Sequence, residues 1–238
     1  MDYSIQLFSV RDFMAQDVEG TIKQLAEMGY KCVEPCGFYD KTAEEFKAIC
    51  DKYGLKISGC HIYHDALKND NNMLEYMKAI GCPAYISPCA VYSNRAEVDE
   101  LVDLYNTLPK KVNDFGLQFQ YHNHDLEFRP NKDGIYTHIE LQKRTNILFQ
   151  LDVYWIYRAG INPMYVLEQL EERIGSIHLR DGDMKHTTPL GQGEVDIAGI
   201  VKWAKERNIP MTVETETSAA RQMDEAKECI DYLLSLED

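Results

Sequence analysis

The chain has 238 residues, and 45% of them are hydrophobic, which is enough apolar material for a large core. Its formal net charge of −14 argues against non-specific binding to nucleic acid or to an anionic membrane surface. No apolar run reaches the roughly 18 residues that a membrane span needs, and no basic, apolar leader precedes the first strand pattern. The seven cysteines include no Cys-x-x-Cys pair, so we expect small, buried apolar side chains. These features predict a cytoplasmic protein without a nucleic-acid or membrane partner.

Strand and helix patterns alternate along the whole chain. The predicted strands cover residues 3–8, 31–34, 56–61, 84–87, 117–121, 147–151, 176–179 and 211–213. The predicted helices cover residues 18–28, 42–53, 69–80, 94–115, 137–143, 163–173, 197–206 and 219–236. Eight strand–helix units of about 30 residues each indicate an α/β fold, a single (β/α)8 TIM barrel that spans residues 1–238 as one domain.

Local signals refine this assignment. Thr42 and Glu45 have the spacing of a capping box at the start of the second predicted helix. Pro109 is expected to kink or split the helix at 94–115. The segment 181–194 has neither a helix nor a strand pattern, and its glycines would allow it to fold over the mouth of the barrel as a functional loop.

A cluster of polar side chains follows the strand pattern at residues 117–121. The chain there carries two imidazoles, an amide and two carboxylates, those of His122, His124, Asn123, Asp125 and Glu127. So many polar groups at the mouth of a strand are costly to bury unless they bind something. His, Asp and Glu are also ligands of divalent metals. The alternative is a polar loop whose histidines only cap neighbouring groups.

Other predicted strands end in similar side chains. In α/β barrels the catalytic groups come from the carboxyl ends of several strands, which meet at one face. By this rule the sequence places at that face Glu34, His61, His122, His124, Glu127, Asp152, His178, Glu214 and Glu216. Charged groups are seldom fully buried without partners. Their convergence predicts a metal site with additional acid–base groups.

Eight segments along nearly the whole chain carry a resemblance to a known family. They are residues 6–12, 33–38, 59–61, 121–128, 151–155, 178–181, 189–196 and 213–214. The run Tyr-His-Asn-His at 121–124 and the run Leu-Gly-Gln-Gly-Glu at 190–194 are specific to one branch. With these motifs the chain resembles the sugar phosphate isomerase/epimerase family with the xylose isomerase-like barrel, a superfamily that also includes endonuclease IV.

The resemblance implies a metal site. Members of the family hold Mn²⁺, Co²⁺, Mg²⁺ or Zn²⁺ with Glu, Asp, His and Glu from the last four strands, and Mn²⁺ is the ion we expect here. Three of these ligands fall on Asp152, His178 and Glu214. Where many relatives have Glu after the fifth strand, this chain has His122, which we expect to replace it. His124 and Glu127 are the alternatives at this position.

The resemblance also implies an enzyme, a divalent-metal-dependent isomerase or epimerase of a sugar, keto-sugar or polyol. A side chain would remove the proton α to a metal-bound carbonyl by way of an enediolate. The candidate bases are His124, Glu127 and Glu214. His124 is attractive because the unperturbed pKa of an imidazole lies near the working pH.

Four further side chains are candidate substrate contacts. Glu34 and His61 are expected to bind substrate hydroxyls. Trp155 offers an apolar face to the sugar ring, and a place in the core or at the rim is the alternative. Arg180 is expected to bind an anionic or hydroxyl group of the substrate, and a salt bridge to Asp181 or Asp183 is the alternative.

Other functions remain open. The His-x-His variant also resembles inosose dehydratases and lyases of oxidised glycosides, so a lyase or dehydratase acting on keto-sugars, oxidised glycosides or inosose is the main alternative. A non-catalytic sugar-binding barrel and an endonuclease IV-like nuclease are further alternatives, and the acidic composition argues against the nuclease. The expected partners are a small-molecule sugar or polyol, a second copy of the chain in a homo-oligomer, and an oxidoreductase that generates the ketone.

Overall fold

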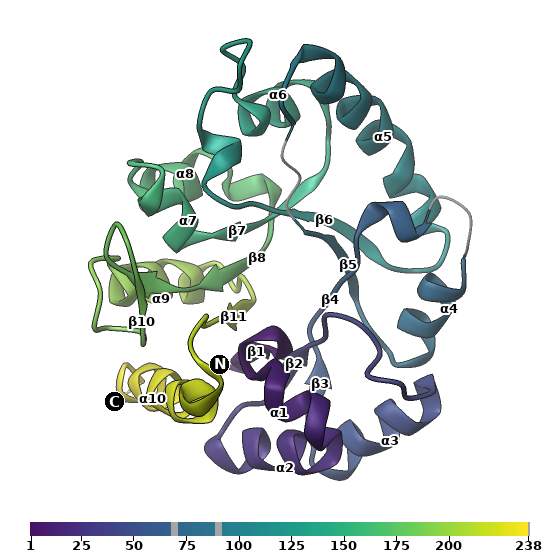
Figure 1. Cartoon of the computed structure of the whole chain (residues 1–238), viewed down its shortest axis with the longest axis vertical. Coiled ribbons are helices and arrows are strands. Elements are labelled where there is room, and N and C mark those ends of the chain that lie inside the picture. Colours follow the sequence, from purple (N-terminus) through teal and green to yellow (C-terminus); the bar gives the residue numbers. More distant parts are fainter. Residues whose placement is uncertain (68–70, 89–91, 238) are drawn as a thin grey trace.

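Parallel strands form the inner wall of the molecule, and helices surround it (Figure 1). The computed structural model describes residues 1–67, 71–88 and 92–237. The strands of the barrel are β1 (Ser4–Gln6), β2 (Cys32–Glu34), β3 (Lys56–Ile57), β4 (Cys60–His61), β5 (Ala84–Ser87), β6 (Gln118–His122), β7 (Leu148–Asp152), β8 (Ile174–Leu179) and β11 (Met211–Val213). Their order in the sheet is β3-β2-β1-β11-β8-β7-β6-β5-β4.

The short strands β3 and β4 together occupy one strand position of the barrel. β3 pairs with β2, and β4 pairs with β5. Between them, Gly59 passes so close to Ile86 that a Cβ atom would lie 2.6 Å from that side chain. The N–H of His61 donates to Pro35 O (2.9 Å), and that of Ile62 donates to Ile86 O (3.1 Å). The segment of β3 and β4 therefore contacts the chain on both sides, next to β2 and next to β5. The predicted (β/α)8 barrel is confirmed, with its third predicted strand divided at Gly59.

The described residues include ten α-helices. They are α1 (Arg11–Gln16), α2 (Val18–Met28), α3 (Ala43–Lys52), α4 (Asn72–Ala79), α5 (Arg95–Asn113), α6 (Thr137–Arg144), α7 (Val153–Arg158), α8 (Pro163–Gln169), α9 (Ile197–Glu206) and α10 (Gln222–Ser235). Eight of them correspond to the predicted helices, although residues 69 and 70 of the third predicted helix lie outside the described residues. Short 3₁₀ helices occupy Leu7–Val10, His64–Leu67, Leu126–Phe128, Glu171–Arg173 and Ala219–Arg221.

The sequence pattern does not predict α1, which follows β1 after a 3₁₀ helix, or α7, which follows β7 directly. The first predicted strand ends early because the side chain of Gln6 accepts a hydrogen bond from Phe8 N (3.1 Å) and caps a 3₁₀ helix that leads into α1. Asp152, the last residue of β7, accepts a hydrogen bond from Trp155 N (3.0 Å) and caps α7 in the same way. A capping side chain at a strand end thus starts the 3₁₀ helix before α1 and starts α7 itself, a signal that hydrophobic periodicity does not carry.

Two other local predictions have opposite outcomes. The capping box is present: Thr42 Oγ1 accepts a hydrogen bond from Glu45 N (3.2 Å), and Thr42 N donates to Glu45 Oε2 (2.9 Å). Pro109 does not split its helix, because α5 runs from Arg95 to Asn113 through the proline. The segment without a predicted element contains a small antiparallel ladder between β9 (Asp181–Gly182) and β10 (Thr187–Thr188).

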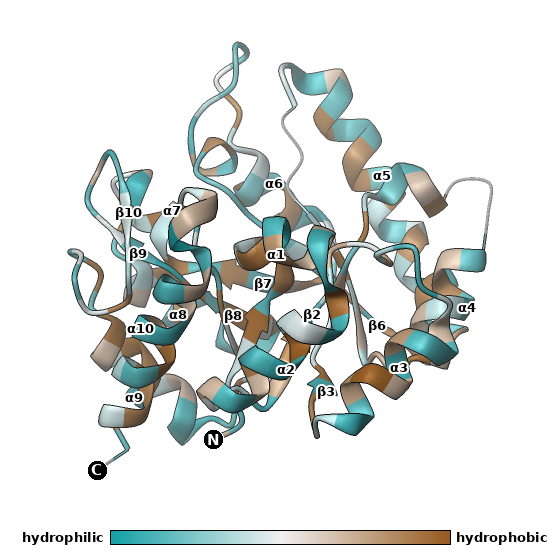
Figure 2. Ribbon diagram, turned by 60° about the horizontal axis from the view of Figure 1, so that its bottom comes forward, coloured by the Kyte–Doolittle hydropathy of each residue, from teal (hydrophilic) through white to brown (hydrophobic). Residues whose placement is uncertain are grey.

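Side chains alternate between the two faces of each strand, which decides what fills the barrel. In β6, Phe119 and Tyr121 belong to the hydrophobic core between sheet and helices, and they alternate with Gln120 and His122, which are buried polar residues. The outer helices combine polar and apolar stretches (Figure 2), as expected for helices with one face on the sheet and one in water. The inside of the barrel is therefore polar, and the apolar core lies around it.

The structure can also be compared with two expectations from composition, on membrane spans and on cysteines. Among the residues that the structure describes, no helix has the length and apolar character to cross a membrane. Five cysteines of the described part are free and buried, and Cys36 is free and half-buried. The expectation for Cys89 lies outside the described residues.

Candidate active site

Four side chains converge at the carboxyl ends of neighbouring strands: His122 from β6, Asp152 from β7, His178 from β8, and Glu214 just after β11. Their positions follow from the register, because Asp152 pairs with His178 across β7 and β8. One ligand atom from each of the four lies within 4.8 Å of the others. His122 is the member of this group that comes from the fifth predicted strand.

This group fits a divalent metal ion. Its donor set is two imidazoles and two carboxylates, all buried, and such ligands bind first-row divalent metals. Asp152 Oδ2 is buried and has no hydrogen-bond partner, with Arg180 Nε 3.5 Å away as a cation near it, so its lone pairs are available to a metal ion. Within the described residues, His61, His122 and His178 form a second, overlapping group of this kind.

His178 lies between two carboxylates. Its Nε2 is 2.7 Å from Glu34 Oε1, and its Nδ1 is 2.9 Å from Glu214 Oε2. Burial lowers the pKa of His178, but Glu34 and Glu214 outweigh burial and raise that pKa to about 10. Both ring nitrogens of His178 are therefore protonated at neutral pH, and the imidazole is positively charged. A metal ion bound by one of these nitrogens has to displace its proton.

A buried amide lies beneath the histidines. Gln150 Nε2 donates to Glu34 Oε2 (2.8 Å) and to Ser176 Oγ (3.1 Å), so its oxygen is the atom that faces the imidazoles. That oxygen accepts from His61 Nε2 (2.8 Å) and from His122 Nδ1 (3.0 Å). His122 thus carries its proton on Nδ1 and keeps the lone pair of Nε2 for a ligand.

Glu34 belongs to this lower layer. Its side chain is 1% exposed, and besides His178 and Gln150 it binds Gln6 Nε2 (2.8 Å) and His61 Nε2 (3.0 Å). Despite burial, the interactions with His178 and His61 hold the pKa of Glu34 well below its usual range. Glu34 is an ionised acceptor that orients two histidines.

Arg180 lies behind two of the candidate ligands. Its guanidinium contacts Glu214 Oε2 (2.8 Å), Asp152 Oδ2 (3.5 Å) and Glu216 Oε2 (3.4 Å), in place of the predicted alternative partners Asp181 and Asp183. It also packs 5.0 Å from the ring centroid of Trp155, which is 8% exposed. Burial opposes ionisation of Glu214, but Arg180 and His178 hold its pKa well below the usual value.

His124 and Glu127 lie in the loop after β6. The Glu127 carboxylate accepts hydrogen bonds from Tyr121 OH (2.7 Å) and from His124 N (3.1 Å), so it holds the loop in place. The His124 ring packs between His122 and Trp155, with centroids 5.0 and 5.1 Å away. Its Nδ1 has no hydrogen-bond partner, and burial together with Arg180 lowers its pKa to about 4. His124 is therefore neutral at physiological pH, and its pKa lies below the working pH, unlike that of the unperturbed imidazole on which its choice as a base rested.

A cavity of about 480 Å³ opens above these groups. Gln6, His61, His122, His124 and Glu214 form its polar lining. Of the predicted site residues, Glu34, Trp155 and Arg180 are not among the residues that line it. His61 is thus the predicted substrate contact that reaches the cavity, and the other three lie behind its wall.

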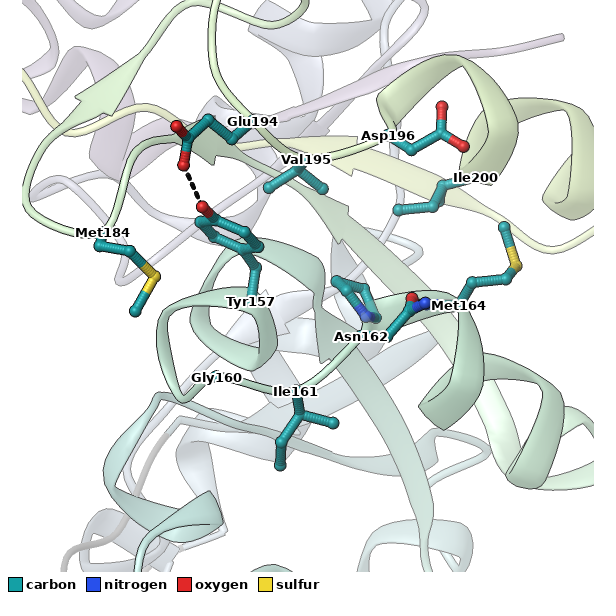
Figure 3. A pocket seen from close by; sticks show the side chains of 11 residues that line it. Tyr157, Gly160, Ile161, Asn162, Met164, Met184, Glu194, Val195, Asp196 and Ile200 are labelled. Carbon is teal, nitrogen blue, oxygen red and sulfur yellow. Dashed lines mark hydrogen bonds between the residues drawn. The ribbon is translucent and has the colours of Figure 1, made fainter.

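A larger cavity, of about 620 Å³, lies between the turn that joins α7 to α8 and the segment that precedes α9 (Figure 3). There the hydroxyl of Tyr157 donates to Glu194, and Met184 and Ile161 supply apolar surface. It shares no lining residue with the candidate ligand group. We therefore assign the reaction to the smaller cavity.

Sequence reasoning missed two residues that organise the site. Gln150 orients His61 and His122, and the signal for it was its place two residues before Asp152, on the same face of β7. Asp181 accepts hydrogen bonds from the backbone N–H groups of Gly191 (2.9 Å), Gly193 (3.0 Å) and Val195 (3.1 Å). Asp181 therefore fastens the loop that was predicted to cover the mouth, and no residue of that loop lines the cavity.

Comparison with known proteins agrees with this architecture. The family model described as xylose isomerase-like TIM barrel matches residues 22–236. The 2-oxo-tetronate isomerase of Haemophilus influenzae is 26% identical over 194 residues, which are 70% of this chain and 75% of that protein. A sugar phosphate isomerase/epimerase from Parabacteroides distasonis has a TM-score of 0.83 at 23% identity over 98% of both chains. A probable 3-DHS dehydratase from Bacillus anthracis has a TM-score of 0.81 at 15% identity over 98% of this chain and 99% of that one. The chain belongs to the xylose isomerase-like TIM barrel family.

Proposed function

We propose that the protein is a divalent-metal-dependent isomerase or epimerase of a sugar, keto-sugar or polyol. The observation that carries this proposal is the convergence of His122, Asp152, His178 and Glu214 beside a cavity that also holds His124. The named activities of similar proteins, 2-oxo-tetronate isomerase and sugar phosphate isomerase/epimerase, support the same reaction class.

The four converging residues would hold the metal ion. Mn²⁺ is our first choice for a mixed set of imidazole and carboxylate ligands, with Co²⁺, Mg²⁺ and Zn²⁺ as alternatives. When bound, such an ion supplies Lewis-acid polarisation of a substrate carbonyl and neutralises the negative charge that develops on its oxygen. Every proton transfer is left to the side chains of the cavity.

Two groups of the cavity suit proton transfer at carbon. His124 is neutral and has an unpartnered ring nitrogen, so we assign it to removal of the proton α to the carbonyl. Glu214 lines the same cavity as an ionised carboxylate, so it can exchange a proton at another position of the substrate. An isomerase needs this pair of roles, because the proton leaves one atom and returns at another. Glu127 positions His124 through its backbone.

The remaining candidates fall into two roles. We propose that His61, which lines the cavity, contacts a substrate hydroxyl. Glu34, Trp155 and Arg180 lie behind the lining, and their contacts favour the orientation of histidines and carboxylates over direct substrate binding. We also propose that the protein works as a single-domain cytoplasmic enzyme. A homo-oligomer and a partner oxidoreductase remain predictions.

The test is proton exchange at carbon. Protein reconstituted with Mn²⁺ is incubated in D₂O with ketohexoses, tetronates and 3-keto-glycosides, and deuterium incorporation next to the carbonyl is followed by NMR. We expect exchange and interconverted sugars, both lost in Asp152→Asn and kept in the surface control Asp183→Asn. Stoichiometric metal with no exchange from any of these ketones would refute the proposal.

One observation favours lyase or dehydratase chemistry as the second candidate. His122 is a neutral imidazole fixed by Gln150 at the position where many relatives have Glu, so one of the two acidic groups of an epimerase is replaced. A single base, His124, followed by expulsion of a β-substituent, then suffices. In the same incubation, loss of the glycosidic substituent from 3-keto-glycosides would identify a lyase, and interconversion without loss would identify an isomerase.

A further inference from the structure

The cavity beside the candidate ligands has polar and apolar side chains in its lining. Its polar lining includes the three imidazoles of His61, His122 and His124 and the carboxylate of Glu214. Its apolar lining is formed by Phe8, Ile62, Tyr63, Ala66, Met73 and Pro88, and Cys36 and Gly37 complete the described wall. Both groups border one space of about 480 Å³. A substrate whose carbonyl lies beside the imidazoles therefore shares this space with apolar side chains.

Phe8 is fixed in an exposed position. Its side chain is 39% exposed although it is a large hydrophobic residue. Its backbone N–H donates to Gln6 Oε1 (3.1 Å), and its carbonyl accepts from Arg11 Nη1 (3.0 Å). The guanidinium of Arg11 also lies 4.5 Å from the centroid of the phenyl ring. These contacts hold the ring at the cavity without covering it.

Tyr63 lines the same cavity and is 65% exposed. Its backbone is held on both sides: Tyr85 OH donates to Ile62 O (2.7 Å), and Ala66 N donates to Tyr63 O (3.0 Å). An exposed apolar surface that adjoins a polar site, on a backbone held by hydrogen bonds, is typical of a ligand-binding wall.

The described lining contains neither Lys nor Arg. Arg11 is engaged by the carbonyl and ring of Phe8. Arg180 is buried and paired with Asp152, Glu214 and Glu216. Within the described lining, a phosphate or carboxylate on the substrate would therefore meet no unpaired Lys or Arg, the side chains that normally bind such groups. The net charge of −14 would also repel it.

We propose that the natural substrate is an uncharged keto-sugar that still carries an apolar substituent, such as an aryl group in glycosidic linkage. The sugar lies beside the imidazoles and Glu214, and the substituent packs against Phe8, Tyr63 and Met73. This inference rests on the proposed function for the identity of the reacting end. An uncharged substrate would distinguish this protein from enzymes that act on sugar phosphates or sugar acids.

Binding without turnover tests the apolar wall. Mn²⁺-reconstituted protein is titrated calorimetrically with phenyl and methyl β-glycosides of glucose, galactose and xylose, and with glucose 6-phosphate. We expect at least one phenyl glycoside to bind about tenfold or more tightly than its methyl partner, since a buried phenyl ring removes a large apolar area from water. Phe8→Ala and Tyr63→Ala should bring the ratio towards one. Tyr63→Phe, which keeps the ring, and Tyr165→Ala, an exposed tyrosine elsewhere, should preserve it.

The opposite results overturn the proposal. Equal affinities within every phenyl–methyl pair, absence of phenyl glycoside binding throughout, or tighter binding of glucose 6-phosphate would each exclude an apolar subsite for an uncharged substrate. A second arm measures α-proton exchange from 3-keto-glucose, its phenyl glycoside and its 6-phosphate. Exchange without preference for the phenyl compound refutes the subsite and leaves the proposed function standing. Tight binding of a phenyl glycoside without any α-proton exchange supports the apolar subsite and refutes the proposed function.

Discussion

Gln150 Oε1 lies 3.0 Å from His122 Nδ1 and sets the tautomer of that imidazole. The amide is oriented by Glu34, which accepts from its nitrogen at 2.8 Å. Burial, reinforced by His178 and His61, lowers the pKa of His122 well below its ordinary value. A neutral ring with a fixed N–H presents its second nitrogen as a permanent acceptor, which is what a metal requires of histidine.

Removal of this amide should weaken metal binding. We expect Gln150→Ala to lower the affinity for Mn²⁺ by about 10- to 100-fold, as is usual when the partner that orients a metal-binding histidine is lost. Competition with a fluorescent chelator measures the affinity. Gln192→Ala, an exposed glutamine outside the cavity, is the matched control. Unchanged affinity in Gln150→Ala would show that His122 is not a ligand.

Metal binding should release protons in a pH-dependent way. His178 has a pKa of about 10 because Glu34 and Glu214 outweigh the effect of burial. Below that pH its proton must leave before the ring can bind a metal, so the apparent affinity should rise about tenfold per pH unit up to roughly pH 10. Burial also raises the pKa of Asp152 to about 6. Below that pH a second proton is displaced, and the slope should approach about a hundredfold per unit.

Calorimetry in buffers of different ionisation enthalpy counts the released protons. Near pH 8 we expect about one proton per Mn²⁺ bound, and nearly two near pH 5. The control is His186→Ala, because that histidine is 78% exposed and remote from the ligand group. Binding that releases no proton near pH 8 would mean that His178 stays protonated beside the ion and is not a ligand.

Much of the barrel could be predicted because alternation of apolar and polar residues records which face of a strand meets the helices. Phe119 and Tyr121 in β6 give that signal, and the strand ends then place His122, Asp152 and His178 at one mouth. The same rule would also have identified Gln150, two residues before Asp152. Its amide is a weaker signal than a titratable side chain, because amides are common inside and outside sites.

The features of the site that the sequence pattern does not predict depend on contacts that periodicity within one element does not record. Trp155 follows a strand end, but its burial depends on α7, which starts from the cap provided by Asp152 and leaves no periodic pattern. Glu127 folds back onto the backbone of His124 through a turn of 3₁₀ helix. Phe8 and Tyr63 line the cavity together although 55 residues separate them. Hydrophobic periodicity describes one element at a time, so it does not report such pairs.

Arg180 should stabilise the fold by neutralising buried carboxylates. It contacts Glu214 at 2.8 Å and Asp152 at 3.5 Å. Arg180→Gln leaves these charges without their cation, and loss of one partner of a buried pair costs about 3–5 kcal/mol. We expect a lower melting temperature without metal, partly restored by Mn²⁺, because the ion supplies the missing positive charge. Arg221→Gln, which breaks an exposed pair with Glu228, should cost at most about 1 kcal/mol. Equal melting temperatures of Arg180→Gln and the native protein would contradict this role.

His124 should be needed for proton transfer and dispensable for metal binding. It lines the cavity but is absent from the converging ligand group. We expect His124→Ala to lower kcat by about 10²–10⁴-fold, the usual contribution of a general base, with Mn²⁺ content unchanged. Deuterium exchange next to the carbonyl should fall by the same factor, and His186→Ala should leave both rates intact. If His124→Ala instead lost its metal, His124 would be the ligand from the fifth strand and the base would have to be sought at Glu214.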